Sequence, residues 1–396
     1  MNNSKKTMLA FSGGLDTSFC LLHLKELGYE VGTLTVDTGG FSSEELTAIE
    51  TRAYELGSSK HWTLDARAEL FRDFIAYIIK GNVLRGGVYP LCVGAERVIQ
   101  ARELTKIAKS WEASSVAHGC TGAGNDQVRF DIQIGASAPG MEIIAPIRDL
   151  ALSREHEIAY IEERGFKVEK SHKKYSINMG LLGTTIGGGQ IHDAWEAVPN
   201  DAYTEPKSER AAEDIVLKFD GGIPVALNDQ KIEAHLLLSQ LNQIGGAHRI
   251  GRGVHIGDTI LGIKGRIAFE APGLLMVINA HRELEKITLT KWQQMIKSQA
   301  AEQYGMFLHE GQWSNPVMRD LEALLNSSQK FVTGEAKLRL AGGHFEVLGV
   351  RSEYSLINAR AAYGEGSKLW SPADARGFCK ISGIQNSLSE ARNVKL

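Results

Sequence analysis

The sequence predicts an α/β protein whose first half is a doubly wound parallel sheet. Three observations indicate this fold. Short apolar runs alternate with helical patterns through the first half, three predicted strands end in polar loops, and the composition changes after about residue 170. Such alternation is typical of a parallel sheet with helices on both faces. The chain of 396 residues also exceeds the size at which one core usually stops growing, so we expect two domains.

The elements of the first half are predicted in a regular order. Strands are expected at 8–11, 31–36, 61–64, 115–119 and 143–146. Helices are expected at 17–27, at 43–56 with a serine cap, along the apolar positions 71–78, and at 96–113. Ligands bind at the carboxyl ends of strands in such sheets. The loops after Phe11, Val36 and Gly119 should therefore be functional.

The second half is predicted to be an α+β domain followed by an arm. Segment 175–189 is rich in Gly and Thr and is expected to be a loop between domains. Strands are expected at 215–219, 259–263 and 274–278, a long helix at 284–304, and a hairpin around Gly342-Gly343. We predict a first domain at 1–170, a second domain at 171–362, and an arm at 363–396 that packs on another subunit.

Composition excludes several classes of protein. A net charge of −3 does not favour a binder of nucleic acid or of membrane surfaces. The four cysteines form no CxxC pair, which predicts reduced thiols in a cytoplasmic protein. The first apolar run is too short for a signal peptide. The sequence contains no run of ~18 apolar residues, so we expect no membrane span.

The phosphate loop, Ala10–Ser18, carries the strongest signal. Its sequence AFSGGLDTS lies between a predicted strand and a predicted helix. Two glycines let the backbone approach a phosphate, and the helix N-terminus offers free N–H groups to an anion. The loop lacks the GxxxxGK[ST] pattern of a Walker A motif. The alternative is an ordinary capped turn.

The second loop, 118–131, carries groups that suit an amino acid. Thr121 and Asn125 could bind a carboxylate, Asp126 an ammonium group, and Arg129 another carboxylate. The alternative is a polar turn without a ligand.

Both loops resemble one family. The phosphate loop resembles that of the ATP pyrophosphatase superfamily, and its full sequence is similar to the argininosuccinate synthase branch. The second loop and the segments 145–149, 175–177 and 311–316 are also similar to that branch, so the resemblance covers nearly the whole chain. It implies an adenine nucleotide alpha hydrolase-like domain, a synthetase domain, a C-terminal arm and a homotetramer.

The resemblance also implies a reaction and its substrates. In this family a ureido oxygen of citrulline attacks the α-phosphate of magnesium-bound ATP, pyrophosphate leaves, and the amine of aspartate then displaces AMP. The implied cofactors are therefore ATP and Mg²⁺, and the implied partners are aspartate and a citrulline-like acceptor.

The resemblance assigns site residues to individual positions of this sequence. The implied ATP contacts are Ala10, Phe11, Ser12, Gly13, Gly14, Leu15, Asp16, Thr17, Ser18, Val36 and Gly119. The implied aspartate contacts are Thr121, Asn125 and Asp126. The implied acceptor contacts are Tyr89, Asn125, Arg129, Ser176, Thr185, Gly257 and Phe269. The catalytic candidates are Asp16, Asp126 and Arg129; no metal ligand is singled out, although Asp126 and the ATP phosphates are candidates.

The acceptor positions depart from the family pattern. A serine of the family falls on Gly94, its citrulline-binding glutamate on Gly257, and its contacting tyrosine on Phe269. These losses suggest a pocket with more volume and an acceptor that lacks the α-ammonium group or carries a bulkier tail. The alternative is an ordinary member of the family in which Asp258 or another acid replaces the glutamate, and a one-residue slip in the alignment would place Asp258 there directly.

Two other functions remain open from the sequence. The altered acceptor positions and Ala123, which replaces a lysine of the second loop, would suit a nucleotide-binding regulator without catalysis. The preserved ATP and aspartate positions argue against it. A tRNA-modifying thiolase or an amidotransferase synthetase would need a basic tract, a CxxC pair or a glutaminase domain, and the sequence has none of these.

Overall fold

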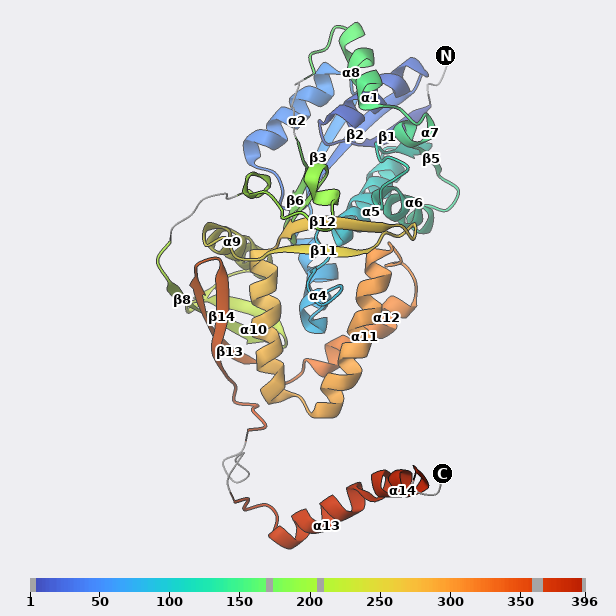
Figure 1. Ribbon diagram of the computed structural model, residues 1–396. Coiled ribbons are helices and arrows are strands. Elements are labelled where there is room, and N and C mark those ends of the chain that lie inside the picture. The colour runs from blue at the N-terminus through green and yellow to red at the C-terminus, as the bar shows by residue number, and fades with distance from the viewer. Residues whose placement is uncertain (1–4, 169–173, 205–209, 358–365, 394–396) are drawn as a thin grey trace.

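The computed structural model describes residues 5–168, 174–204, 210–357 and 366–393, which form a body of three sheets and a projecting arm (Figure 1). The predicted domain boundaries at 170/171 and 362/363 both lie outside the described residues. The division into three parts therefore stays a prediction.

The first sheet confirms the predicted fold class. It has five parallel strands in the order β3-β2-β1-β4-β5. Their bounds are β1 Lys6–Ala10, β2 Glu30–Asp37, β3 Lys60–Asp65, β4 Ser115–Ala117 and β5 Glu142–Ile144. The order brings the loops after β1, β2 and β4 to one edge of the sheet, as the sequence predicted.

Helices cover both faces of this sheet. The first face packs against α1 Leu15–Glu26, α2 Ser43–Glu55, α7 Pro146–Asp149 and α8 Arg154–Glu163 through an apolar cluster that includes Leu9. The next residue, Met8, points to the opposite face, which α5 Gly94–Ser110 covers. Ser42 caps α2 in a reciprocal pair with Glu45, which confirms the predicted serine cap. Helix α6 Asp126–Ser137 packs on α5 and was not predicted as a helix.

The second half holds two antiparallel sheets. One sheet has the order β11-β12-β7-β6 and the other β10-β9-β8-β13-β14. The first consists of β6 Ser176–Gly180, β7 Gly183–Gly187, β11 Arg252–Asp258 and β12 Lys264–Glu270. The second consists of β8 Glu213–Asp220, β9 Ile223–Leu227, β10 Gln230–Lys231, β13 Gly334–Ala341 and β14 His344–Arg351. The predicted hairpin around Gly342-Gly343 is confirmed by β13 and β14.

Four predictions for this half are wrong. Segment 175–189 forms the β6–β7 hairpin rather than a loop, because its small residues pair across the sheet. Segment 259–263 is the turn between β11 and β12. Segment 274–278 belongs to α10 Pro272–Thr288, since an apolar run buried on all sides has no period that separates strand from helix. The helix expected at 284–304 is two helices, and the second, α11 Lys291–His309, begins at a Thr290–Gln293 capping box.

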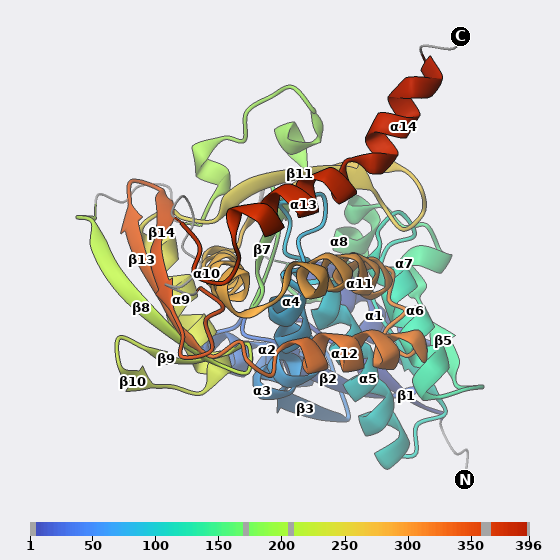
Figure 2. The ribbon, with the colours of Figure 1, turned by 90° about the horizontal axis from the view of Figure 1, so that it is seen from below.

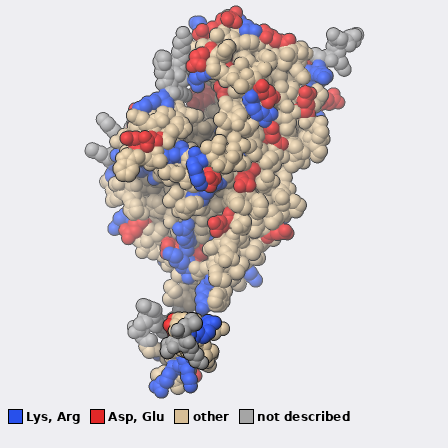
Figure 3. All heavy atoms as spheres, turned by 45° about the vertical axis from the view of Figure 1, so that its right-hand side comes forward, with Lys and Arg blue, Asp and Glu red and all other residues tan. Residues whose placement is uncertain are grey.

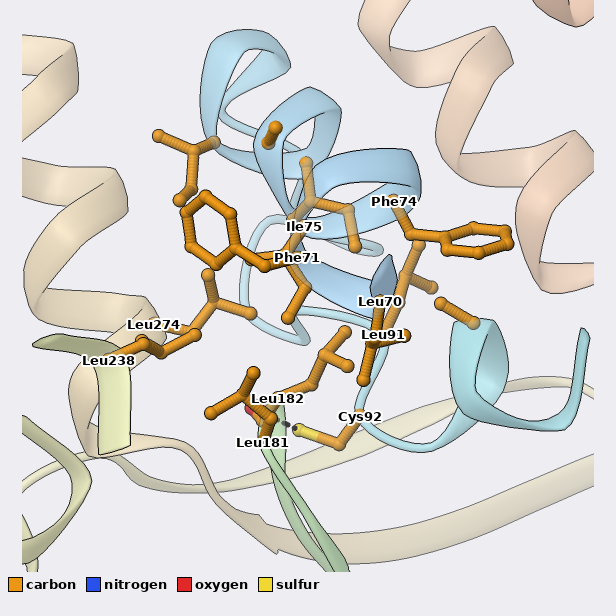
Figure 4. Close-up of a cluster of buried hydrophobic side chains, with 14 of the residues drawn as sticks. Leu70, Phe71, Phe74, Ile75, Leu91, Cys92, Leu181, Leu182, Leu238 and Leu274 are labelled. Atoms are coloured by element: carbon orange, nitrogen blue, oxygen red, sulfur yellow. Dashed lines mark hydrogen bonds between the residues drawn. The ribbon is translucent and has the colours of Figure 1, made fainter. Parts of the chain in front are cut away.

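One core joins the two halves. The segment predicted as a long helix is a continuous run of α3 Arg67–Leu70, a π-helical turn at 71–75 and α4 Ala76–Gly81. Its apolar side chains point toward the β6–β7 turn and toward α9 Ala234–Ala247 and α10 (Figure 4). Cys92 donates to the carbonyl of Leu182 in that turn, at 3.4 Å. This packing fixes the β6–β7 hairpin over the carboxyl edge of the first sheet.

The remaining helices lie beside the second half. Seen from below (Figure 2), α10 lies next to the β13–β14 hairpin, and α12 Val317–Ser328 packs on α11. The arm consists of α13 Pro372–Ser382 and α14 Ile384–Asn393, and neither helix has a buried residue. Figures 1 and 2 both show α14 reaching beyond the body.

Surface charge is mixed. In the face shown in Figure 3, acidic and basic side chains of the described residues are interspersed. Within the described part of the chain, no helix combines the length and apolar character that a membrane span requires.

Candidate active site

The phosphate loop is open for an anion. Gly13 has φ of +73°, a conformation that favours glycine, and Gly14 caps α1 without a side-chain hydrogen bond to its first N–H groups. Ser12 and Gly14 are exposed, whereas Ser18 is buried. The hydroxyl groups of Ser12 and Thr17 lie 3.3 Å apart. The loop thus offers N–H groups and two hydroxyls, but the Ser18 side chain does not reach solvent.

Neighbouring strands hold this loop in place. The hydroxyl of Thr35 donates to the carbonyl of Phe11 at 2.7 Å. Gly119 lies directly against α1, since a Cβ at this position would be 3.3 Å from side-chain carbons of Asp16 and Thr17. The side chain of Val36 is buried in the core, so only its backbone can face a nucleotide.

A carboxyl pair lies beneath the phosphate loop. Glu157 on α8 is buried, and one of its carboxylate oxygens has no hydrogen-bond partner. Burial and the neighbouring charge of Asp16 raise the pKa of Glu157 to about 8. Its protonated form can donate to Asp16, so this pair places a hydrogen bond at the first turn of α1.

The second loop leads into α6 and is ordered by His118. The Nδ1 atom of His118 accepts from the backbone N–H of Cys120 at 3.2 Å, and its Nε2 donates to Asp131 at 2.9 Å. Arg148 donates to the same carboxylate at 2.7 Å. His118 therefore positions the loop.

Asp126 lies between two arginines at the start of α6. Its Oδ2 accepts from Arg97 and its Oδ1 from Arg129, each at 2.8 Å. Burial alone would raise the pKa of Asp126, but the charges and hydrogen bonds of both arginines outweigh it and hold the pKa at about 2. Asp126 is therefore an anion throughout the physiological range.

Arg97 and Arg129 also join the two halves. Arg97 donates to Asn178 on β6 at 2.9 Å. Arg129 donates to the carbonyl and the Nδ1 atom of His309 on α11, at 2.9 and 3.2 Å. Burial, and then the charge of Arg129, lower the pKa of His309 to about 2, so its imidazole is neutral.

Asn125 connects the second loop to the second half. Its side-chain oxygen accepts from the backbone N–H of Ile260, in the β11–β12 turn, at 2.8 Å. Its amide N–H groups form no hydrogen bond with another described residue and remain available to a ligand. Thr121 is exposed on the same loop.

One face of the sheet β11-β12-β7-β6 supplies the predicted acceptor residues. Thr185 pairs with both Asn178 and Phe269, and Phe269 pairs with Gly253. Directly paired residues point to the same face, as do residues two apart on one strand. Ser176 and Gly257 therefore share this face, which lies toward the second loop.

Tyr89 and Phe269 meet at this face, but neither presents a polar group. Their ring centroids are 5.3 Å apart, and Phe269 is buried. The Tyr89 hydroxyl donates to the carbonyl of Cys92 at 2.5 Å. Gly94 lies near Arg129, because a Cβ there would be 3.9 Å from its guanidinium carbon.

The pocket does not gain the expected volume at Gly257. The ring of His255, on the same strand, covers it, and a Cβ at Gly257 would lie 2.8 Å from the His255 Nε2 atom. Four residues of the site were not predicted from the sequence: His255, Arg97, His309 and Glu157. None of them belongs to a motif, and only their contacts show their place in the site.

Comparison with known proteins identifies the family. Residues 6–167 match the family model "Arginosuccinate synthase N-terminal HUP domain", and residues 175–389 match "Arginosuccinate synthase C-terminal domain". The chain belongs to the argininosuccinate synthase family. The chain is 41% identical over 394 residues to the argininosuccinate synthase of Xanthomonas campestris, with 98% of each chain covered. It is 40% identical over 395 residues to that of Dictyoglomus turgidum, with 99% of each covered, and 38% identical over 392 residues to that of Methanocaldococcus jannaschii, with 98% of each covered.

Membership confirms the predicted resemblance and its extent. Relatives named argininosuccinate synthase occur in bacteria and in archaea, and the two family models match both halves of the chain. Nothing in these comparisons supports the alternatives of a regulator without catalysis or of another class of phosphate-loop enzyme.

Proposed function

We propose that the protein is an AMP-forming ligase that joins the amine of aspartate to citrulline or a related ureido acceptor. One observation carries the proposal. The phosphate loop, the second loop and one face of the sheet β11-β12-β7-β6 converge, and each of them carries residues that the family resemblance assigns to ATP, aspartate or the acceptor.

The phosphate loop would bind the triphosphate of ATP. Gly13 and Gly14 let the backbone approach the phosphates, and the N-terminus of α1 favours their negative charge. Asp16 would orient this first turn through its contact with Glu157. Gly119 closes the other side without a side chain that would exclude the nucleotide.

The second loop would bind aspartate. Thr121 and the amide of Asn125 would donate to a carboxylate. Each carboxylate oxygen of Asp126 already accepts one bond and retains capacity to accept from the ammonium group of aspartate. Asp126 would thus hold the reacting nitrogen of aspartate in position by its charge.

The acceptor would lie between Arg129 and the sheet face. Arg129 and Asn125 would orient the ureido group, with Ser176 and Thr185 as further hydroxyl contacts. The ureido oxygen forms a bond to the α-phosphorus as the bond to pyrophosphate breaks. The aspartate nitrogen then bonds to the ureido carbon, AMP leaves with the oxygen, and the nitrogen loses a proton. The protein supplies position and charge for these steps.

Magnesium would enter with the nucleotide. Among the described residues, no group of three or more His, Cys, Asp or Glu side chains could hold a metal ion. Asp126 does not suit a metal ligand, because both of its oxygens accept from arginines. Magnesium commonly binds through phosphates with few protein ligands, so the ATP phosphates are its proposed site.

The arm is the proposed contact with further copies of the chain. Phe378, Ile381 and Leu388 are 72%, 70% and 64% exposed on α13 and α14. Side chains of this kind are usually covered in solution, and a second copy of the chain is the proposed cover. We propose the homotetramer of the family, in the cytoplasm, with the arm as its oligomerisation element.

The test is formation of products in a fixed ratio. Purified protein would receive magnesium-ATP, aspartate and citrulline, and pyrophosphate, AMP and argininosuccinate would be measured together. We expect equal amounts of the three. Without ATP or citrulline no product should form, and without aspartate pyrophosphate should stop at the single equivalent that forms with the bound adenylate. Pyrophosphate without a joined product would contradict ligation, and no pyrophosphate from the folded, ATP-binding protein would contradict the proposed activity.

A further inference from the structure

One end of the proposed acceptor site is formed by His255. Its ring stacks on Tyr89, with centroids 5.3 Å apart and planes at 18°. It also lies over Gly257 and against Gly86, where a Cβ would be 3.3 Å from its Cε1 atom. Two residues without side chains thus make room for this ring. Neither ring nitrogen of His255 forms a hydrogen bond with another described residue, so both are available to a ligand.

The charged groups around this end are mainly basic. Arg85 donates to the carbonyl of Asp258 at 2.8 Å, but no carboxylate of the described residues lies within ion-pair distance of it. The charges of Arg129 and Arg85 act on one another, and both act on His309. The guanidinium of Arg85 therefore has N–H groups that lack an anionic partner.

The carboxylates around this end are engaged, remote or already opposite a cation. Glu310 is the carboxylate whose charge acts most on Arg85, although the two form no ion pair. Asp126 accepts from two arginines. Asp258 pairs with Lys264 at 2.6 Å, on the exposed side of the hairpin. Gly257, at the centre of this end, offers no side chain at all. An ammonium group placed here would face Arg85 and Arg129 and would compete with Arg85 for the charge of Glu310.

The His255 ring can donate a hydrogen bond to an anion. Burial, and then the charge of Arg85, lower the pKa of His255 below its ordinary value. The ring is therefore neutral at pH 7 and acts as an N–H donor beside the positive charge of Arg85.

We infer that His255 and Arg85 form an anion-binding end of the acceptor site, and that the protein selects a ureido acid by its carboxylate and not by an ammonium group. The inference rests on the proposed function, because it assumes that a ureido acceptor binds against Arg129. His255 and Arg85 are then specificity-determining residues. They recognise the end of the acceptor that does not react.

Three acceptors separate the two kinds of recognition. Citrulline carries both groups, 5-ureidopentanoate keeps the carboxylate and lacks the ammonium, and 4-ureidobutylamine keeps the ammonium and lacks the carboxylate. With magnesium-ATP and aspartate, we expect 5-ureidopentanoate to match or exceed citrulline in kcat/KM for pyrophosphate release. We expect kcat/KM for 4-ureidobutylamine to be at least about tenfold lower than for citrulline, because loss of a charge-assisted hydrogen bond lowers kcat/KM by that factor or more.

The outcomes distinguish this inference from the proposed function. Turnover of 4-ureidobutylamine at the level of citrulline, with loss of 5-ureidopentanoate, would overturn the inference and leave the ligase intact. Absence of pyrophosphate with all three, from protein that binds ATP, would overturn both.

Variants add a second readout. Arg85→Met and His255→Ala should raise KM for 5-ureidopentanoate about tenfold or more and leave KM for ATP within about twofold. The matched control is Lys264→Ala, which removes an exposed cation from the same hairpin and should change neither KM. Equal KM values for 5-ureidopentanoate in wild type and both site variants would overturn the assignment of these residues.

Discussion

Arg97 offers the sharpest test of how the site is organised. It is not proposed to touch a substrate, yet it donates to Asp126 at 2.8 Å and to Asn178 at 2.9 Å. Arg97→Met removes both bonds and the charge while it keeps much of the side-chain volume. The variant therefore tests whether the position and charge of Asp126 depend on Arg97.

The expected magnitude follows from exposure and remaining partners. The Arg97 and Asp126 side chains are 16% and 33% exposed, so the pair is partly screened, and Arg129 still bonds Asp126 in the variant. A hydrogen bond to a charged group contributes roughly 1.5–3 kcal/mol, and about 1.4 kcal/mol is a factor of ten. We expect kcat/KM for aspartate to fall about 10- to 100-fold, with KM for ATP within about twofold.

The pH profile should change in a defined direction. In the wild type the two arginines hold the pKa of Asp126 at about 2 against the effect of burial. Loss of Arg97 removes one of these charges, so the pKa of Asp126 rises. Activity should then decline at a higher pH on acidification than in the wild type. The assay is pyrophosphate release against aspartate concentration from pH 5 to pH 8.

A matched arginine on the same helix controls for general destabilisation. Arg102 on α5 pairs with Asp73 at 2.8 Å and Glu69 at 3.2 Å, on a different face of the helix. Arg102→Met should lower thermal stability without a change in KM for aspartate. If Arg97→Met is folded and shows the KM and pH profile of the wild type, the assigned role of Arg97 is wrong.

Three further predictions concern buried groups and the phosphate loop. Lys297→Met should lower the free energy of unfolding by about 3–5 kcal/mol in denaturant titrations, because Glu285 would lose its buried partner at 2.7 Å; an unchanged midpoint would contradict this. Burial and the charge of Asp16 raise the pKa of Glu157 from about 4.5 to about 8, so its contribution to stability is complete at low pH and is lost as pH rises through 8. Glu157→Gln should therefore lose less thermal stability than the wild type between pH 6 and pH 9, as melting curves would show. Gly119→Ala would press a methyl group against α1 at 3.3 Å and should raise KM for ATP about tenfold, with KM for aspartate as the internal control.

The sequence pattern was sufficient to predict the strands of the first sheet but not to predict the elements of the second half. The strands of the first sheet are short apolar runs between helices, and the capping box Ser42–Glu45 is a local signal. The run Leu274–Ile278 is buried on all sides, so its period could not distinguish a strand from α10. Thr290–Gln293 is also a local capping signal, and it would have divided the long predicted helix.

The same contrast holds within the site. The phosphate loop and Asp126 lie in compact motifs whose chemistry is visible from neighbouring residues. Arg97 meets Asn178 across 81 positions, and Arg129 meets His309 across 180 positions. Contacts at such separations depend on the packing of the two halves, and no local pattern encodes them.

Strand register determines which side chains the acceptor meets. A shift of one residue in β11 would turn His255 and Gly257 away from the site and replace them with Ile256 and its neighbours. The turn of this hairpin is held to the second loop by the bond from Ile260 to Asn125 at 2.8 Å. The loop proposed for aspartate therefore also fixes the position of the strand proposed for the acceptor. A ligation that places an amine on a ureido carbon needs both substrates aligned, and this bond ties the two binding surfaces together directly.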